Sequence, residues 1–343
     1  MSAQTIYLDH AATTPLLPAA RDAWLDGMAI WANPSSPHAA GRKARAALEE
    51  ARARVKSALW WDGEVIFTSG ASEAIAIAVT RCHQSLSAVS PVEHEAVLRL
   101  ADGVPRLVVD GSGLVDPESV PPVGLVAVQQ ANNETGVMQP IEPIAEAARA
   151  AGGILLCDAA QGAGKLLTPD ADLIALSAHK FGGPVGVGML LVRDWAMLKP
   201  AGGQERGYRA GTENLPGVLA MLAALEAERD WLEEAVRLRD LIDGDIAAAG
   251  GVSIAQDTAR VPSIAAYRMP GKSANAQLIR FDAKGIAVSA GSACSSGSLR
   301  TSHVLAAMGV EGAGEVIRVS LGRETTQAEV EQFLTAWREI AGA

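Results

Sequence analysis

The chain has 343 residues, of which 49% are hydrophobic, 20% charged and 4% aromatic, and its formal net charge is -10 at pH 7. This is the composition of a globular protein, and a length above what one core organises predicts a large domain and a smaller one. The acidic balance and scarce aromatics argue against a nucleic-acid partner. We find neither an apolar run that could cross a bilayer nor a leader pattern, so we expect a cytoplasmic protein without a membrane partner.

Short apolar strands alternate with helical segments along the first two thirds of the chain. The first predicted helix, rich in Ala, Arg and Glu, runs from His38 to about Trp60. A second, from Ile141 to Ala151, is ended by two glycines. The predicted strands are 65–68, 106–109, 125–129, 154–158, 172–177 and 188–192. This alternation is typical of a mostly parallel sheet covered by helices.

The last third of the chain predicts a different arrangement. One helix is expected from about Pro216 to Ala248, apolar at first and charged later, as for a helix that connects two domains. Two strands, 264–267 and 316–321, then mix with helices at about 274–284 and 326–340. We interpret this part as a smaller α+β domain.

Lys180 follows one of the predicted buried strands. Open α/β sheets bind ligands at the carboxyl ends of their strands, and the glycines after Lys180 let the backbone approach a bound molecule. Partial burial lowers the pKa of a lysine and makes its amine a nucleophile. The alternative is a surface lysine before an ordinary glycine turn.

The segment from Ser69 to Glu73 joins another strand to the start of a helix. Free backbone N–H groups at a helix start, together with a hydroxyl, form a natural phosphate site. Neither the G-x-G-x-x-G spacing nor the lysine of a P-loop is present, so a small phosphorylated cofactor fits better than a nucleotide. The alternative is a helix cap at Ser69 or Ser72.

Polar residues also end the remaining strands. Asp158 ends one strand and is followed by Gln161, and an aspartate at the floor of a lysine site can hold a pyridine nitrogen protonated. Asn133 follows another strand, and His94 lies at a helix start. Each alone could be a turn former, a cap or a surface residue. Four strand ends with polar groups favour one common site.

The three cysteines are far apart and form no metal-binding motif, so we expect no metal and reduced thiols. Cys82 and Cys157 adjoin apolar segments and are predicted to be small structural residues. Cys294 differs, because it lies among Ser, Gly and Ala residues that cannot bury it.

Together these segments resemble the pyridoxal-phosphate-dependent cysteine desulfurases of the NifS and IscS type, within the class-V aminotransferase family. The resemblance covers nearly the whole chain. It is carried by YLDHAATTP at 7–15, NPSS at 33–36, TSGASE at 68–73, EH at 93–94, NNETG at 132–136, DAAQ at 158–161, SAHK at 177–180, GGQERGYRAGT at 202–212, the Cys294 loop and RVSLGR at 318–323.

The resemblance implies pyridoxal 5'-phosphate as cofactor and a role for each matching residue. Lys180 would hold the cofactor as a Schiff base and move the substrate α-proton. Asp158 would pair with the pyridine nitrogen and Gln161 with the ring hydroxyl. His94 would stack on the ring as a further catalytic residue.

The phosphate and the substrate would be bound by a second set of residues. Ala71, Ser72, Ser177 and His179 would line the phosphate site, and Thr212 would reach the phosphate of the neighbouring subunit in a homodimer.

Asn133 and Arg318 would receive the substrate, L-cysteine, with the arginine on its carboxylate. Cys294 would take the substrate sulfur as a persulfide and leave alanine. The sulfur would then pass to a partner such as an iron-sulfur scaffold or a sulfur carrier protein.

The implied fold is the α/β, type I fold of pyridoxal-phosphate-dependent transferases. We expect a large cofactor-binding domain at 14–245, with a mostly parallel seven-stranded sheet. A small domain at 1–13 and 246–343 would carry the Cys294 loop. Two alternatives remain open: an aminotransferase or selenocysteine lyase on the same fold, and a catalytically idle relative that serves as a scaffold.

Overall fold

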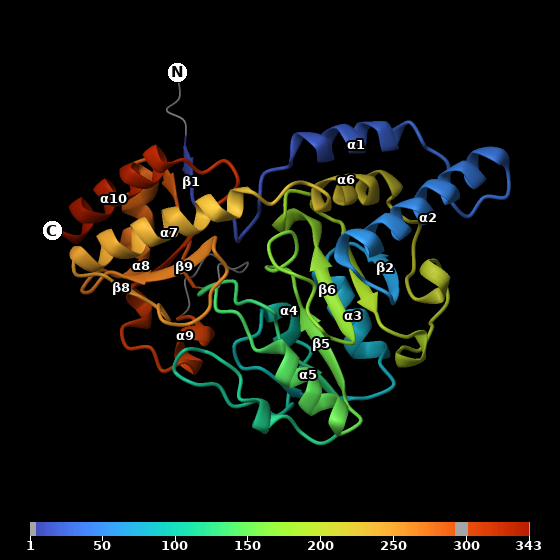
Figure 1. Cartoon of the computed structure of the whole chain (residues 1–343), viewed down its shortest axis with the longest axis horizontal. Helices are drawn as coiled ribbons and strands as arrows, with labels where there is room; N and C mark the ends of the chain where they lie inside the picture. The colour runs from blue at the N-terminus through green and yellow to red at the C-terminus, as the bar shows by residue number, and fades with distance from the viewer. Residues whose placement is uncertain (1–4, 292–300, 343) are drawn as a thin grey trace.

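The computed structural model describes residues 5–291 and 301–342, and its two larger sheets, of six and three strands, lie at opposite ends of the molecule (Figure 1). The larger sheet has the strand order β2-β7-β6-β5-β4-β3. Its strands are β2 (Glu64–Thr68), β3 (Leu86–Val89), β4 (Leu125–Ala127), β5 (Ile154–Asp158), β6 (Leu173–Ser177) and β7 (Gly188–Val192). Only β7 runs antiparallel to its neighbours. The other strands therefore end at the same edge.

Helices cover both faces of this sheet. The helices are α1 (Pro18–Met28), α2 (Ala39–Leu59), α3 (Ala71–Arg81), α4 (Glu95–Leu98), α5 (Ile141–Ala150) and α6 (Leu215–Leu225). Apolar residues of α1, α2, α5 and α6 share one core, and those of α3 and α4 share the core on the opposite face. Every residue of β4 to β7 is buried, as expected for strands covered on both faces.

The smaller sheet has the order β11-β9-β8, from β8 (Val252–Ser253), β9 (Ile264–Arg268) and β11 (Val316–Ser320). Around it lie α7 (Trp231–Ala248), α8 (Ala274–Ala283), α9 (His303–Ala307) and α10 (Gln327–Ala341). β1 (Ile6–Tyr7) pairs with β10 (Ile286–Ala287), so the start of the chain lies beside this part. In its core the rings of Tyr267, Phe281, Phe333 and Trp337 pack against one another, and those of Phe281 and Phe333 are stacked.

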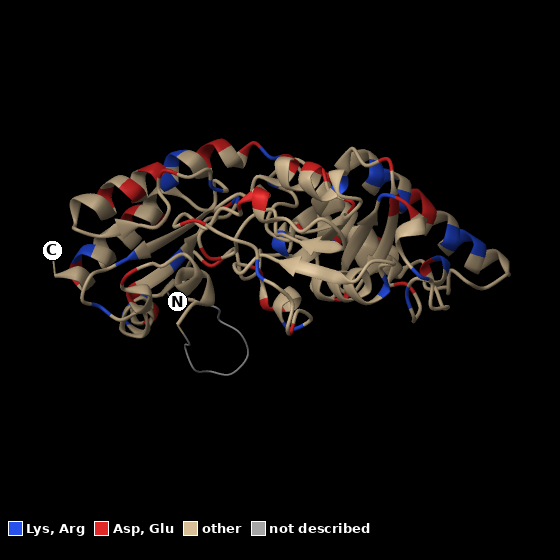
Figure 2. Cartoon of the chain, turned by 90° about the horizontal axis from the view of Figure 1, so that it is seen from below, with Lys and Arg blue, Asp and Glu red and all other residues tan. Residues whose placement is uncertain are grey.

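Apolar residues of α7 from Ala235 onward already belong to the core of the smaller sheet. The predicted domain boundary at residue 245 stays a prediction. Lys and Arg residues are interspersed with Asp and Glu along the helices rather than gathered in one part (Figure 2). None of the helices in 5–291 and 301–342 combines the length and apolar character that a membrane crossing requires.

The α/β class and most predicted elements are confirmed, but the structure also has elements that were not predicted, such as α1, and differs in the following ways. The described large sheet has six strands instead of seven. Residues 106–109 form only isolated bridges beside Val89 and Val115, and β3, which begins with a half-buried Leu-Ser pair, was not predicted. The helix expected from 216 to 248 is divided into α6 and α7 by the turn at 226–230. Cys82 and Cys157 are buried, as predicted.

Gly188 offers a test of how tightly the sheet packs beneath the turn at Gly70. A Cβ at Gly188 would lie 2.5 Å from the carbonyl oxygen of Leu176 and 2.6 Å from Cα of Gly70. We expect Gly188→Ala to lower the free energy of unfolding by about 1–3 kcal/mol, because the contacts could be relieved only by moving backbone atoms, which is energetically costly. Gly244→Ala is the control. Gly244 lies inside α7 with open space at its Cβ position, so alanine should stabilise the protein by about 0.5–1 kcal/mol. Denaturant unfolding measures both, and equal effects would contradict this packing.

Candidate active site

A cavity of about 470 Å³ opens at the carboxyl ends of β2, β5 and β6, and β11 closes its other side. It gathers residues that are far apart in sequence. Among the predicted site residues, those that line it are Ala71, Ser72, His94, Asn133, Asp158, Gln161, Ser177, His179, Lys180 and Arg318. Thr212 is exposed and lies outside this cavity, and Cys294 lies outside the described residues.

Lys180 ends a short 3₁₀ turn, Ala178–Lys180, directly after β6. Its Nζ donates to the carbonyl oxygens of Ala11 and Ala12, both at 2.8 Å. These carbonyls belong to the segment that follows β1, so the start of the chain helps to hold the lysine. The amine is thereby held against two residues that also line the cavity.

Asp158 is the last residue of β5 and is only 8% exposed. Its Oδ1 accepts from the backbone N–H of Ala160 at 3.0 Å. Burial raises the pKa of Asp158, while the hydrogen bond and the charges of His94 and Lys180 oppose that rise. A carboxylate this buried is stable as an anion only beside a cation. A ligand with a protonated ring nitrogen would supply one.

His94 precedes α4 and caps it: Nδ1 accepts from the backbone N–H of Ala96 at 3.1 Å. The neutral ring therefore carries its proton on Nε2. Burial lowers the pKa of His94, and the nearby charge of Asp158 acts in the opposite direction. The geometry gives a neutral, oriented imidazole in the cavity wall.

The turn between β2 and α3 has the features of an anion site. Gly70 has φ 150°, a conformation that L side chains rarely adopt, and α3 starts at the next residue. The first N–H groups of a helix have no partners within the helix and lie at its positive end. Ser177 Oγ is the atom nearest to a Cβ built on Gly70, at 3.6 Å. Backbone donors and hydroxyls thus meet in the space expected for a phosphate.

Arg318 lies in β11 and is buried on the opposite side of the cavity. Its Nη2 is 2.6 Å from Asp9 Oδ1, and its Nη1 donates to the carbonyl of Asn133 at 2.9 Å. No described residue accepts from its Nε. The guanidinium is therefore fixed in place and keeps a donor for a ligand carboxylate.

A further buried polar atom indicates that this cavity is built for a ligand. Gln161 donates from Nε2 to the carbonyl of Ala11 at 2.9 Å, but its buried Oε1 has no partner in the described part of the chain. A ligand hydroxyl could donate to it. The residues present thus match the ring nitrogen, hydroxyl and phosphate of pyridoxal phosphate.

The sequence model of the family described as aminotransferase class-V matches residues 6–333. The chain belongs to the class-V aminotransferases. It is 38% identical to a protein of Cereibacter sphaeroides named cysteine desulfurase, covering 96% of this chain and 94% of that protein. It is 36% identical to an IscS-like cysteine desulfurase of Mycobacterium tuberculosis, again over 96% of this chain and 94% of that protein.

Solved structures place the fold in the same family. A NifS-like protein from Rickettsia africae is 28% identical, with a TM-score of 0.90 over 99% of this chain and all of that one. A structure of SspA in complex with cysteine is 29% identical, with a TM-score of 0.79 over 92% of this chain and 99% of that one. Members of this family use pyridoxal phosphate, which agrees with the donor set of the cavity.

This class-V aminotransferase has cavity residues to which the sequence analysis assigned no role. Glu134 is buried within the NNETG segment, and His303 donates from Nε2 to the carbonyl of Glu93 at 2.9 Å. Burial raises the pKa of both Glu93 and Glu134. The motifs at 93–94 and 132–136 marked the two glutamates, whereas nothing local in the sequence distinguished His303.

Lys165 is a buried lysine near the partly buried Lys180. Both line a smaller cavity of about 30 Å³, and among its lining residues there is no carboxylate. Burial, with the charges of Lys180 and Arg318, lowers the pKa of Lys165 from 10.5 to about 7. Below pH 7 the folded protein must hold this ammonium away from bulk water, which reduces its stability.

Replacing Lys165 should therefore change how stability depends on pH. At pH 6 we expect Lys165→Met to be more stable than wild type by on the order of a few kcal/mol. Between pH 7 and 10.5 the unfolded wild-type chain binds the proton that the folded chain has lost, so wild type gains stability and the difference shrinks. Denaturant unfolding at several pH values measures it. Lys43→Met, on the exposed face of α2, is the control, and a pH-independent difference for Lys165→Met would refute the assignment.

Proposed function

We propose that the protein is a cysteine desulfurase, which converts L-cysteine to L-alanine and keeps the sulfur as a persulfide on Cys294. The observation that carries this proposal is that Gly291 lines the same cavity as Lys180, Asp158 and Arg318. Cys294 follows Gly291 by three residues in the sequence.

Pyridoxal phosphate is the proposed cofactor, and the residues that would hold it come from four strand ends. Lys180 would bind it covalently, with Asp158 at the ring nitrogen and Gln161 at the ring hydroxyl. His94 would lie against the ring. Ala71, Ser72, Ser177 and His179 would surround the phosphate. The bound cofactor would withdraw electrons from the substrate Cα.

The chain's own groups would then handle protons and charge. Lys180 Nζ, released from the cofactor by the incoming substrate amine, would remove the proton from the substrate Cα. Arg318 and Asn133 would hold the substrate carboxylate and so orient that proton. Asp158 would stay ionised beside the cationic ring nitrogen. Burial keeps the pKa of His179 at about 4, so its ring stays neutral at the phosphate.

Cys294 would supply the step that distinguishes desulfuration from transamination. Its thiolate would attack the substrate sulfur, forming the S–S bond while the substrate C–S bond breaks. The electron pair of the C–S bond would remain with the three-carbon fragment, which takes up a proton and leaves as alanine. The persulfide would next pass its outer sulfur to an acceptor protein, such as an iron-sulfur scaffold or a sulfur carrier.

A second copy of the chain would complete the site. Thr212 is exposed and does not reach the cavity of its own chain. In the proposed homodimer it would contact the cofactor phosphate of the partner. The partner is thus part of the proposed active site.

The decisive test uses the purified protein with pyridoxal phosphate and L-cysteine. We expect alanine to form together with a persulfide on Cys294, detected by mass spectrometry. Cys294→Ala should retain the visible absorption of the bound cofactor but lose at least 100-fold in alanine formation. Lys180→Ala should lose both alanine formation and this absorption band.

Each alternative function predicts a different result. Transamination needs no thiol, so an aminotransferase would keep its activity in Cys294→Ala. A selenocysteine lyase would release alanine from selenocysteine much faster than from cysteine. A protein without visible absorption after addition of pyridoxal phosphate would be an idle relative, and both enzyme functions would then be excluded.

A further inference from the structure

The segment from Gln204 to Thr212 contains two residues with strained backbones. Glu205 has φ 50° and Arg206 has φ 56°, the left-handed region that glycine and asparagine favour. Each such residue costs on the order of 1 kcal/mol or more. A conformation of this kind persists only where the surroundings hold it.

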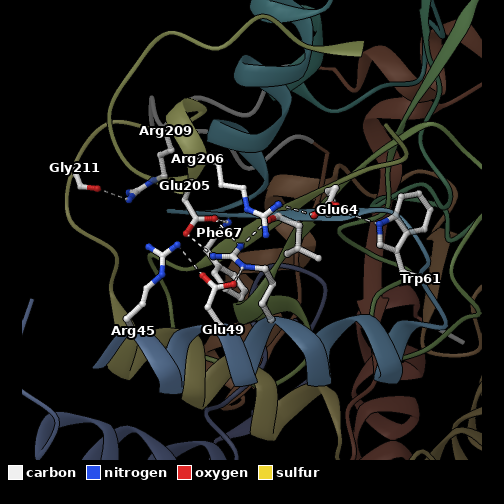
Figure 3. A network of polar contacts seen from close by, with 11 residues as sticks. Arg45, Glu49, Trp61, Glu64, Phe67, Glu205, Arg206, Arg209 and Gly211 are labelled. Carbon is white, nitrogen blue, oxygen red and sulfur yellow. Dashed lines mark hydrogen bonds and ion pairs between the residues drawn. The ribbon is translucent and has the colours of Figure 1, made fainter. Parts of the chain in front are cut away.

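Contacts of its side chain hold Glu205 in this strained conformation. Its carboxylate, labelled Glu205 in Figure 3, is almost fully buried and binds Arg52 of α2 through both oxygens, at 2.8 and 3.0 Å. The backbone N–H of Phe67 donates to the same carboxylate at 2.9 Å. Arg52 also donates to the carbonyl of Val65 at 2.6 Å, so the ion pair is anchored on β2.

A second contact joins the same segment to the turn proposed to bind phosphate. Arg209 lies 3.1 Å from Glu73 through its Nε, and the other oxygen of Glu73 accepts from the backbone N–H of Ser69 at 2.5 Å. Gln204 and Arg209 pair as a bridge, which makes the segment a small closed loop. The loop therefore contacts the chain on both sides of the turn, at Phe67 in β2 and at Glu73 in α3.

We propose that Glu205, bound by Arg52, is a positioning residue that fixes the loop 204–212 on the phosphate turn and so sets where Thr212 projects. This rests on the proposed function, in which Thr212 reaches the phosphate of the second subunit. The turn that binds the phosphate in one subunit would then also support loop 204–212, whose Thr212 contacts the phosphate bound in the other subunit. Glu205 itself touches neither cofactor nor substrate.

The charge of Glu205 can be removed with little change in shape. In Glu205→Gln the buried Arg52 loses its anionic partner, and the strained turn at 205–206 loses the ion pair that stabilises it. We expect the dissociation constant of the apoprotein for pyridoxal phosphate to rise about tenfold or more. Affinity for pyridoxal, which has no phosphate, should change less than twofold. Absorbance titration of the apoprotein measures both.

A double-mutant cycle tests whether Glu205 acts through Thr212. If it does, Glu205→Gln combined with Thr212→Ala binds pyridoxal phosphate no more weakly than the weaker single variant. Additive losses would overturn the proposal, as would an equal loss of affinity for pyridoxal. A wild-type apoprotein that binds no pyridoxal phosphate would instead refute the proposed function.

Asp243→Asn is the matched control. Asp243 forms a similarly buried ion pair with Arg260, at 2.9 Å, beside the smaller sheet. The Asp243→Asn substitution should lower the unfolding temperature of the apoprotein but leave the affinity for pyridoxal phosphate unchanged. If Glu205→Gln does not fold, Arg52→Lys replaces it, because lysine keeps the charge but loses the two-pronged contact. A normal affinity for pyridoxal phosphate in Arg52→Lys would then count against the proposal.

Discussion

The common direction of five strands in the large sheet is the constraint on which the site depends. Parallel strands deliver their carboxyl ends to one edge, so Thr68, Asp158 and Ser177 lie along the same edge of the sheet although about ninety residues separate the first from the second. β7 alone runs in the opposite direction, and its first residue, Gly188, has no side chain where the Gly70 turn packs on it. Any bulk there would displace the turn that starts α3.

Electrostatics then decide what the cavity can hold. Asp158 is a buried carboxyl group near His94 and Lys180, and Lys165 is a buried amine near Lys180 and Arg318. Asp9 neutralises part of the charge of Arg318, and backbone carbonyls accept from Lys180. Such a site suits a ligand that carries a cationic ring nitrogen and anionic phosphate and carboxylate groups, and it suits an uncharged apolar molecule poorly.

Local sequence signals predicted elements whose character does not depend on distant packing. The helix that His38 caps and that ends at left-handed Trp60 was predicted nearly to the residue, because Ala-rich periodicity is local. β3 was missed because four residues with a serine carry too little signal. Residues 106–109 have strand-like composition but obtain only bridge contacts beside Val89. The turn at 226–230 divides a segment whose composition predicted one continuous helix.

The fold class, the family and the chemical types at the site could be predicted from the sequence alone, because Lys180, Asp158, His94 and Arg318 occur in motifs that are recognisable without knowledge of the fold. The burial of these groups and their charged partners depend on tertiary contacts and became known only from the structure. It showed that Asp9 binds Arg318, that Lys165 is buried beside Lys180, and that Arg52 holds Glu205 in a strained turn. Those partners lie from about 15 to more than 300 residues apart, and burial and charge coupling arise only when the chain brings them together.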